Sequence, residues 1–289
     1  MKTRTVFHIA LVFILMLPVS ARPGDPEMAA GMAHFYQQKW DDAISHFKQA
    51  LREDPQRTLA LCYLLQTYYR KKDLNSVLKE IEAEAEGGEP VATAHLGLAR
   101  FLRGMIRPDV MEEALSPLNQ AIERDPALAI GYCGLGMVSF QQREMPRSKE
   151  YFLETLRRNP DDVMALELLG NILLVDEKKP EEALEQYQKI NALLPTYPDG
   201  QYYTGSVLFD LGQSEAAVSR LELAIELDPK GLTKGADAAA LLGDVYLKLG
   251  QPGKARAFKE KAFALWGHQE RPDKHWDWVE PPGRRQPFE

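Results

Sequence analysis

Adjacent carboxylates are the first residues in this chain that could do chemistry, because two neighbouring acids can divide the proton donor and acceptor roles of a hydrolase. The sequence holds three such pairs, Asp41-Asp42, Glu112-Glu113 and Glu181-Glu182. Each pair is followed directly by an alanine, so the same three-residue pattern occurs three times along the chain. An active site would not be repeated in this way. Acidic side chains in the first turn of a helix are stabilised by the helix dipole. We therefore predict a structural role for all three pairs, in the first turns of helices.

Glycines and histidines offer two further kinds of chemistry. Gly131, Gly134 and Gly136 are spaced somewhat like a phosphate-binding loop, but that loop needs a strand before the glycines and a helix that begins at them. Here the glycines fall inside a predicted helix. The histidines are scattered, without the short spacings of zinc ligands. The sequence predicts no catalytic, cofactor-binding or metal-ligating residue, no cofactor, and no enzyme activity.

The charge balance bears on the class of partner. Lys and Arg number 35 and Asp and Glu number 42, which gives a formal net charge of -7. Nucleic-acid binding requires a basic stripe that can replace the counterions of the phosphates. We therefore expect no nucleic acid partner, and no attraction to acidic membranes.

The first 21 residues have the form of a secretory signal peptide. Lys2 and Arg4 precede an apolar run over residues 6–17, and small residues end at Ala21, where we expect cleavage. The run is shorter than the roughly 20 residues of a membrane-spanning helix, although an uncleaved anchor is the alternative. Arg22 follows the expected cut, so no lipid-modified cysteine is expected there. The sequence predicts an exported protein, periplasmic or secreted, and its form favours a bacterial envelope.

The elements that must position any site come from a stretch of 34 residues, 129–162, whose spacing recurs along the chain. Tyr132, Leu135, Gly136, Phe152 and Pro160 carry the pattern. This stretch resembles the tetratricopeptide repeat (TPR), a helix-turn-helix unit with an aromatic residue, Leu-Gly, a small residue, a second aromatic residue and a closing proline at those positions.

The spacing has a mechanical reason. Two antiparallel helices approach closely where one presents glycine and the other a small residue, here Gly136 and Ser148. Pro160 ends the second helix because proline cannot donate the next backbone hydrogen bond. The resemblance implies an all-α fold, a TPR-type α-solenoid that forms a right-handed superhelix.

The pattern recurs about seven times within residues 22–269. The predicted units are 24–57, 58–89, 90–128, 129–162, 163–197, 198–231 and 236–269. The third unit holds five extra residues within 103–109, expected to project from its turn, and the fifth unit has one added residue. Residues 232–235 separate the last two units, and Lys259 replaces the aromatic residue of the seventh, as suits a polar capping repeat.

Cys62 and Cys133 occupy equivalent positions in the first helices of units two and four. Neighbouring helix axes lie about 8 to 10 Å apart, and a disulfide needs alpha carbons within about 7 Å. With a whole unit between them, we predict two free thiols.

The resemblance also implies a binding surface, because such arrays hold peptides on the inner, concave face of the first helices. The residues that carry over to those positions are Met28, Met32, Phe35, Tyr36, Tyr69, Leu98, Phe101, Met137, Phe140, Tyr202 and Phe209. They predict an apolar groove for a protein or peptide partner with apolar side chains. The alternative is that part of this stripe is core. Glu167 stands where the carboxylate clamp of the family's chaperone-binding members needs Lys, beside Asn171, so chaperone tails are not expected.

Residues 270–289 change to proline, tryptophan and charge, and predict an extended tail. Trp276 and Trp278 either dock a partner or fold back on the seventh unit. Taken together, these patterns predict a non-catalytic interaction scaffold or adaptor with no small-molecule substrate. Its alternatives are an accessory subunit of an envelope enzyme, secretion, polysaccharide-export or pilus-assembly complex, and an enzyme in its own right.

Overall fold

The computed structural model describes residues 25–268, and every regular element within that range is helical. The predicted all-α solenoid is confirmed. Fourteen α-helices form seven antiparallel pairs along the chain. The pairs are α2 (Pro26–Tyr36) with α3 (Trp40–Glu53), α4 (Thr58–Arg70) with α5 (Leu74–Ala85), α6 (Pro90–Ile106) with α7 (Leu115–Arg124), α8 (Ala129–Gln141) with α9 (Met145–Arg158), α10 (Val163–Asn171) with α11 (Pro180–Leu193), α12 (Pro198–Asp210) with α13 (Ser214–Leu227), and α14 (Gly235–Lys248) with α15 (Pro252–His268).

The two helices of a pair interlock at the predicted glycine. In the fourth pair, the Ser148 hydroxyl donates to the Gly136 carbonyl oxygen at 2.9 Å. A Cβ atom at Gly136 would lie only 2.6 Å from the buried Phe152 ring. The glycine therefore makes room for the second-helix aromatic ring as well as for the small residue. Gly31 with Phe47 repeats this contact at the same 2.6 Å.

The extra residues of the third unit are helical instead of a projecting turn. Helix α6 continues to Ile106, and a 3₁₀ helix, η2 (Pro108–Ala114), returns along it to α7. A Cβ atom at Gly104 would lie 2.7 Å from the Met111 alpha carbon, so glycine allows this close return. The prediction for Glu112 and Glu113 was wrong, because the insertion places them in η2 and not in the first turn of α7. The other two acidic pairs do begin α3 and α11.

The added residue of the fifth unit produces a π-helical segment, η3 (Ile172–Asp176), at the end of α10. A π turn spans one residue more than an α turn, so it absorbs a single insertion without breaking the helix. Beyond it, Lys178 adopts φ of 57°. Gln38, Lys72 and Arg143 adopt φ of 63° at the same place in their own pairs. The turn between the two helices is thus kept despite the insertion.

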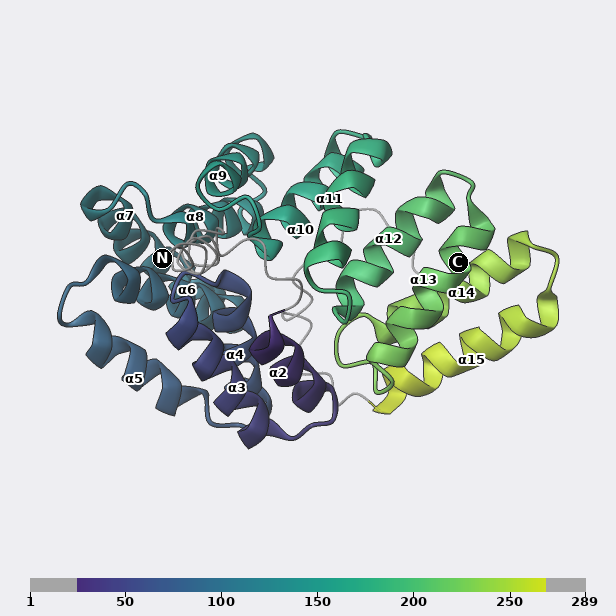
Figure 1. Cartoon of the computed structure of the whole chain (residues 1–289), viewed down its shortest axis with the longest axis horizontal. Coiled ribbons are helices and arrows are strands. Elements are labelled where there is room, and N and C mark those ends of the chain that lie inside the picture. Colours follow the sequence, from purple (N-terminus) through teal and green to yellow (C-terminus); the bar gives the residue numbers. More distant parts are fainter. Residues whose placement is uncertain (1–24, 269–289) are drawn as a thin grey trace, which may run out of the picture.

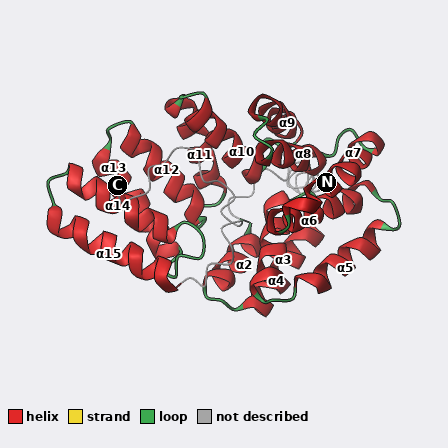
Figure 2. Ribbon diagram, turned by 180° about the vertical axis from the view of Figure 1, so that it is seen from behind, coloured by secondary structure: helices red, strands yellow, loops and turns green. Residues whose placement is uncertain are grey.

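The pairs follow an arc, and its two ends approach each other (Figure 1). Seen from behind, the second helices α5, α9, α11 and α15 lie toward the outside of this arc (Figure 2). The first helices form the inner layer, where α4 packs against α10 as well as against its neighbours in the chain. Within the described residues, no helix has the length and apolarity needed to cross a membrane.

Two predictions concern residues outside the described range. The proposed signal peptide covers residues 1–21, and the tail with Trp276 and Trp278 covers residues 270–289.

Candidate functional site

The structure divides the residues predicted to line the groove into two sets. Eight are buried, each 6% exposed or less: Met28, Met32, Phe35, Tyr36, Leu98, Phe101, Met137 and Tyr202. Three are partly exposed: Tyr69, Phe140 and Phe209. Both sets pack against one hydrophobic core, so the stripe is partly core and partly surface.

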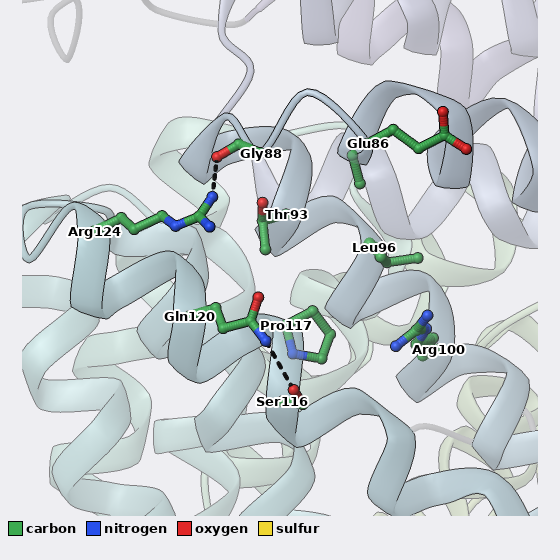
Figure 3. A pocket seen from close by; sticks show the side chains of 10 residues that line it. Glu86, Gly88, Thr93, Leu96, Arg100, Ser116, Pro117, Gln120 and Arg124 are labelled. Carbon is green, nitrogen blue, oxygen red and sulfur yellow. Dashed lines mark hydrogen bonds between the residues drawn. The ribbon is translucent and has the colours of Figure 1, made fainter.

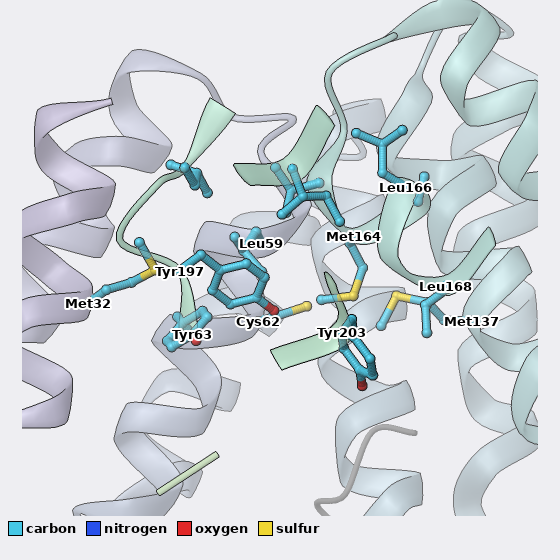
Figure 4. Packing of buried hydrophobic residues seen from close by; sticks show 14 of the residues in the cluster. Met32, Leu59, Cys62, Tyr63, Met137, Met164, Leu166, Leu168, Tyr197 and Tyr203 are labelled. Carbon is cyan, nitrogen blue, oxygen red and sulfur yellow. The ribbon is translucent and has the colours of Figure 1, made fainter. Parts of the chain in front are cut away.

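The buried set is covered because the inner layer closes on itself. Phe35 meets the Tyr63 ring edge-on, with centroids 5.2 Å apart, and the Tyr63 ring in turn lies 6.3 Å from that of Tyr197. Tyr63 belongs to α4, whereas Tyr197 directly precedes α12. Figure 4 shows Tyr197 among side chains of α2, α4 and α10, including Met32, Tyr63 and Met164. Residues from the first, second, fifth and sixth pairs thus share one core.

A group of polar side chains joins the two ends of the array at this point. We call it the closure cluster, and its members are Tyr36, Tyr63, Glu167, Tyr197, Asp199, Asp228, Thr233 and Lys234. The hydroxyl oxygens of Tyr36 and Tyr63 lie 2.7 Å apart. The Tyr36 hydroxyl lies 3.2 Å from the Thr233 hydroxyl, 197 residues along the chain. The Thr233 hydroxyl donates to Asp199 at 2.6 Å.

The spacer before α14 is shaped to make these contacts. Asp228 accepts hydrogen bonds from the backbone N–H groups of Leu232, Thr233 and Gly235 at 2.8 to 2.9 Å. A Cβ atom at Gly235 would lie 2.1 Å from the Asp228 carbonyl oxygen, so only glycine fits there. From the second pair, the Arg70 guanidinium donates to the Leu232 carbonyl oxygen at 2.9 Å. The spacer between the last two units is therefore bound by hydrogen bonds to the first two units, through Tyr36 and Arg70.

Buried acids give the closure cluster its electrostatic character. Burial raises the pKa of Glu167 to about 8, with the nearby charge of Asp199 adding to the effect. Burial also raises the pKa of Asp199 to about 7, although the Thr233 hydroxyl and Lys234 act in the opposite direction. The Tyr197 hydroxyl donates to Glu167 at 2.6 Å. Both acids therefore titrate near neutral pH, whereas ordinary carboxyl groups titrate at about pH 4.

A second contact across the arc lies at the start of α10. The Thr58 hydroxyl donates to the buried Asp162 side chain at 2.9 Å, and Asp162 also accepts from the Ala165 N–H. The Cys133 sulfur lies 3.8 Å from the same carboxylate. The prediction of two free thiols is confirmed for Cys62 and Cys133. Burial raises the pKa of both thiols, so neither is poised as a nucleophile.

The family's clamp positions are occupied by internal bonds. Glu167 is bonded to Tyr197, and Asn171 accepts a hydrogen bond from the Tyr187 hydroxyl at 2.9 Å. Both side chains are buried, which does not suit the capture of a peptide carboxylate from solvent. Among the residues described, no group of three or more His, Cys, Asp or Glu side chains could hold a metal ion.

The accessible residues of the predicted surface stand near the ends of first helices. Tyr69, Phe140 and Phe209 each stand next to last in α4, α8 and α12. Leu247 holds the same place in α14 and is 50% exposed. We call these four residues the open edge. The Lys248 ammonium lies 4.8 Å from the centroid of the Phe209 ring.

The sequence predicts apolar side chains at these positions, and it does not predict the closure cluster. In the sequence, Glu167 indicates only that a carboxylate clamp is lacking, and Thr233 lies within the spacer of residues 232–235. An acid inside the otherwise apolar first helix of a unit and an irregular spacer of four residues were the two available signals.

The profile of the Tetratricopeptide repeat family matches residues 28–76, 133–198 and 202–267, which is more than half of the chain. A curated relative, "Transcriptional regulator HilA" of Salmonella typhimurium, is 28% identical over 170 residues, covering 50% of this chain and 31% of that protein. "Hsp70-Hsp90 organizing protein 1" of Glycine max is 23% identical over 234 residues, covering 69% of this chain and 41% of that protein.

The chain thus spans about a third of the length of the curated relative matched first. Among solved structures, the "APC/C hetero-tetramer Cut9-Hcn1" gives a TM-score of 0.62 at 17% identity. That match covers 81% of this chain and 45% of the solved chain. At this identity the likeness concerns the fold.

Proposed function

Because the chain belongs to the tetratricopeptide repeat family, we propose that it is a non-catalytic scaffold that binds a protein or peptide partner. The name of the Glycine max relative describes a protein that organises other proteins, which supports this class of function. Such a scaffold needs a surface and no reaction centre.

The observation that carries the proposal is the open edge. Large apolar side chains are costly to leave in water, and a series of them along one surface is typical of a site for another protein. Tyr69 and Phe209 are 140 residues apart in the chain, yet each stands at the same position of its helix. We propose that the partner presents apolar side chains to this edge. The net charge of -7 supports a partner other than nucleic acid.

The eight buried residues of the predicted groove could contact the partner only after the array opens. Met28, Met32 and Phe35 are at most 1% exposed, so a partner reaches them only if the packing around them opens. We propose that binding begins at the open edge and that the buried set extends the groove in an opened array.

We also propose that the protein is exported, on the strength of the sequence over residues 1–21, and that it acts in the periplasm or outside the cell. Its tail, with Trp276 and Trp278, is a second proposed docking segment. Truncation after Gln269 separates the two alternatives for the tail, because a lower melting temperature indicates a cap and a lost partner indicates a docking arm.

The test of the open edge is a double substitution, Phe140→Ala with Phe209→Ala, in a protein used as bait in the envelope fraction. We expect capture of the partner to be lost while the helical circular dichroism signal is kept. The matched control is Leu153→Ala with Phe263→Ala, which removes two side chains that are 48% and 51% exposed on second helices. Equal capture by both double variants would exclude the open edge as the binding surface.

A further inference from the structure

A polar pocket of about 320 Å³ lies between the end of the second unit and the third unit. It is lined by Ala85, Glu86 and Gly88 at the end of α5, by Thr93, Leu96 and Arg100 of α6, and by Ser116, Pro117, Gln120 and Arg124 of α7. Figure 3 shows the two arginines at opposite ends, with Thr93, Gln120 and Pro117 between them. Leu96 and Arg100 stand two residues to either side of the groove residue Leu98, and therefore on roughly the opposite face of α6.

The pocket has hydrogen-bond donors to offer a ligand. The Arg100 Nε atom is buried and has no hydrogen-bond partner among the described residues. The Arg100 Nη1 atom already donates to the Glu113 carbonyl oxygen at 3.5 Å. An unpaired buried donor is destabilising, so an acceptor that reaches the Nε atom would be stabilised. Gln120 donates one amide hydrogen to the Ser116 hydroxyl at 3.0 Å, which leaves its second amide hydrogen and the hydroxyl proton of Ser116.

The far end of the pocket is held in a fixed shape. The Arg124 guanidinium donates to the Gly88 carbonyl oxygen, which ties the loop after α5 to α7. Gly88 adopts φ of 72°, and a Cβ atom there would lie 2.7 Å from the Arg124 Nη1 atom. The glycine therefore lets the guanidinium approach the loop, and one Arg124 nitrogen is used to hold it.

The charges select the kind of ligand. Arg100 and Arg124 contribute two positive charges, and Glu86 at the exposed rim contributes one negative charge, so the pocket has a local charge of about +1 in a chain of net charge -7. A single carboxylate matches this value, whereas a phosphate dianion would exceed it. Guanidinium groups form paired hydrogen bonds with carboxylates, and Leu96 and Pro117 offer apolar contact to the methylene groups of an acidic side chain.

From this geometry we propose that the pocket is a second binding site, which takes the carboxylate of an acidic peptide segment. Its volume of about 320 Å³ suits one or two side chains. The site stands apart from the open edge, so the proposal goes beyond the function proposed above and does not depend on it.

The test is a titration of the full chain, labelled with ¹⁵N, with an acetylated Glu-Asp peptide amide, its Gln-Asn counterpart and inorganic phosphate. We expect the acidic peptide to shift the backbone amides of Gly88 and Thr93 and the side-chain amide of Gln120. The acidic peptide should half-saturate the site at a concentration at least about tenfold lower than the neutral peptide does. This ratio corresponds to a difference in binding free energy of about 1.4 kcal/mol. Shifts outside the pocket, or equal responses to both peptides, would refute the proposal, and so would phosphate binding as tightly as the acidic peptide.

The matched variants are Arg100→Gln and Arg147→Gln. Arg147 is an exposed arginine of α9, bonded to Glu144 and outside the pocket. Arg100→Gln should weaken acidic-peptide binding at least about tenfold, and Arg147→Gln should leave it unchanged. If Arg100→Gln unfolds the protein, Gln120→Leu is the substitute variant. Gln120 is exposed, so this substitution removes a hydrogen-bond donor from the pocket without leaving a cavity in the core. Equal binding by pocket and control variants overturns the proposal.

Discussion

Helices α8 and α9 form one pair, yet α8 is buried on almost every side and α9 along a single strip. Ten of the 13 residues of α8 are buried, against three of the 14 residues of α9. The difference begins with glycine. A Cβ atom at Gly131 or Gly134 would lie 2.5 Å from Ile122 or Leu118, and one at Gly136 would lie 2.6 Å from Phe152. Neighbours on several sides can approach α8 because it presents no side chain at these points.

The two layers of the array have different structural roles. Helices of the inner layer, such as α8, hold the pairs together and carry the contacts that close the arc. Helices of the outer layer, such as α9, need only one buried strip and leave the rest of their surface to water and to exposed ion pairs, which contribute little. A substitution should therefore matter according to its layer and strip more than according to its residue type.

The largest effect is expected from Phe152→Ala. Phe152 is fully buried in the strip of α9 that fits against Gly136, so its loss leaves a cavity and should reduce the free energy of unfolding by about 3 to 5 kcal/mol. The next residue, Leu153, is 48% exposed. Leu153→Ala should change that free energy by less than about 0.5 kcal/mol. Urea unfolding followed by circular dichroism measures both, and similar losses would show that α9 has no distinct buried strip.

A smaller effect is expected from filling the space at Gly136. Gly136→Leu forces a side chain toward the Phe152 ring and should lower the free energy of unfolding by about 1 to 3 kcal/mol. Gly253, in α15, has no atom within 4 Å of a Cβ placed on it. Gly253→Leu is therefore the control and should be tolerated. If both variants melt at the same temperature, the tight contact in the fourth pair does not limit packing.

The helices and their pairing could be predicted because the repeat encodes contacts between neighbours. Gly136, Ser148 and Phe152 stand at spacings that only a helix pair explains, and the structure brings them into contact. The local insertions were visible as extra residues but not as shapes. A π turn at Ile172–Asp176 and a 3₁₀ helix at Pro108–Ala114 depend on what packs beside them.

The closure cluster could not be predicted in the same way. Tyr36 and Thr233 are 197 residues apart, and their contact depends on the curvature accumulated over all the pairs between them. Small changes at each interface decide whether the ends meet, and no single repeat records that sum. For the same reason the sequence did not divide the groove residues into buried and exposed sets. Tyr36 and Phe140 are both aromatic residues near the ends of first helices. Tyr36 is buried and contacts Thr233 from the far end of the array, whereas Phe140 stays partly exposed.

The closure cluster predicts a dependence of stability on pH. Burial raises the pKa of Glu167 to about 8, whereas an unfolded glutamate titrates near about 4.3. The folded state therefore binds more protons between these values. The stabilisation from this group is complete below about pH 4.3 and is lost as the pH rises through about 8, with a slope of up to about 1.4 kcal/mol per pH unit.

Glu167→Gln should flatten this slope and stabilise the protein at pH 8 to 9, because the amide stays neutral. The control is Glu154→Gln in α9, where hydrogen bonds from Arg157 and Arg158 lower the pKa of the acid to about 2. That substitution should leave the slope above pH 5 unchanged. Unfolding in urea at a series of pH values measures the effect, and an identical slope in the wild type and Glu167→Gln would contradict the assignment.

The smallest effect is expected from Thr233→Val, which keeps the shape of the side chain and removes its hydroxyl. That hydroxyl donates to Asp199 and lies within hydrogen-bond distance of Tyr36, so its loss should cost about 1 kcal/mol. Hydrogen exchange gives the sharper measurement. Opening of the closure cluster should speed exchange in α2 and at the start of α14 while α9 keeps its protection, because repeat arrays transmit a local fault weakly. Ser219→Ala, which removes an exposed hydroxyl of α13, is the control. Unchanged exchange in α2 would mean that the two ends of the array lie together without stabilising each other, and that the buried groove residues are held by their own pair alone.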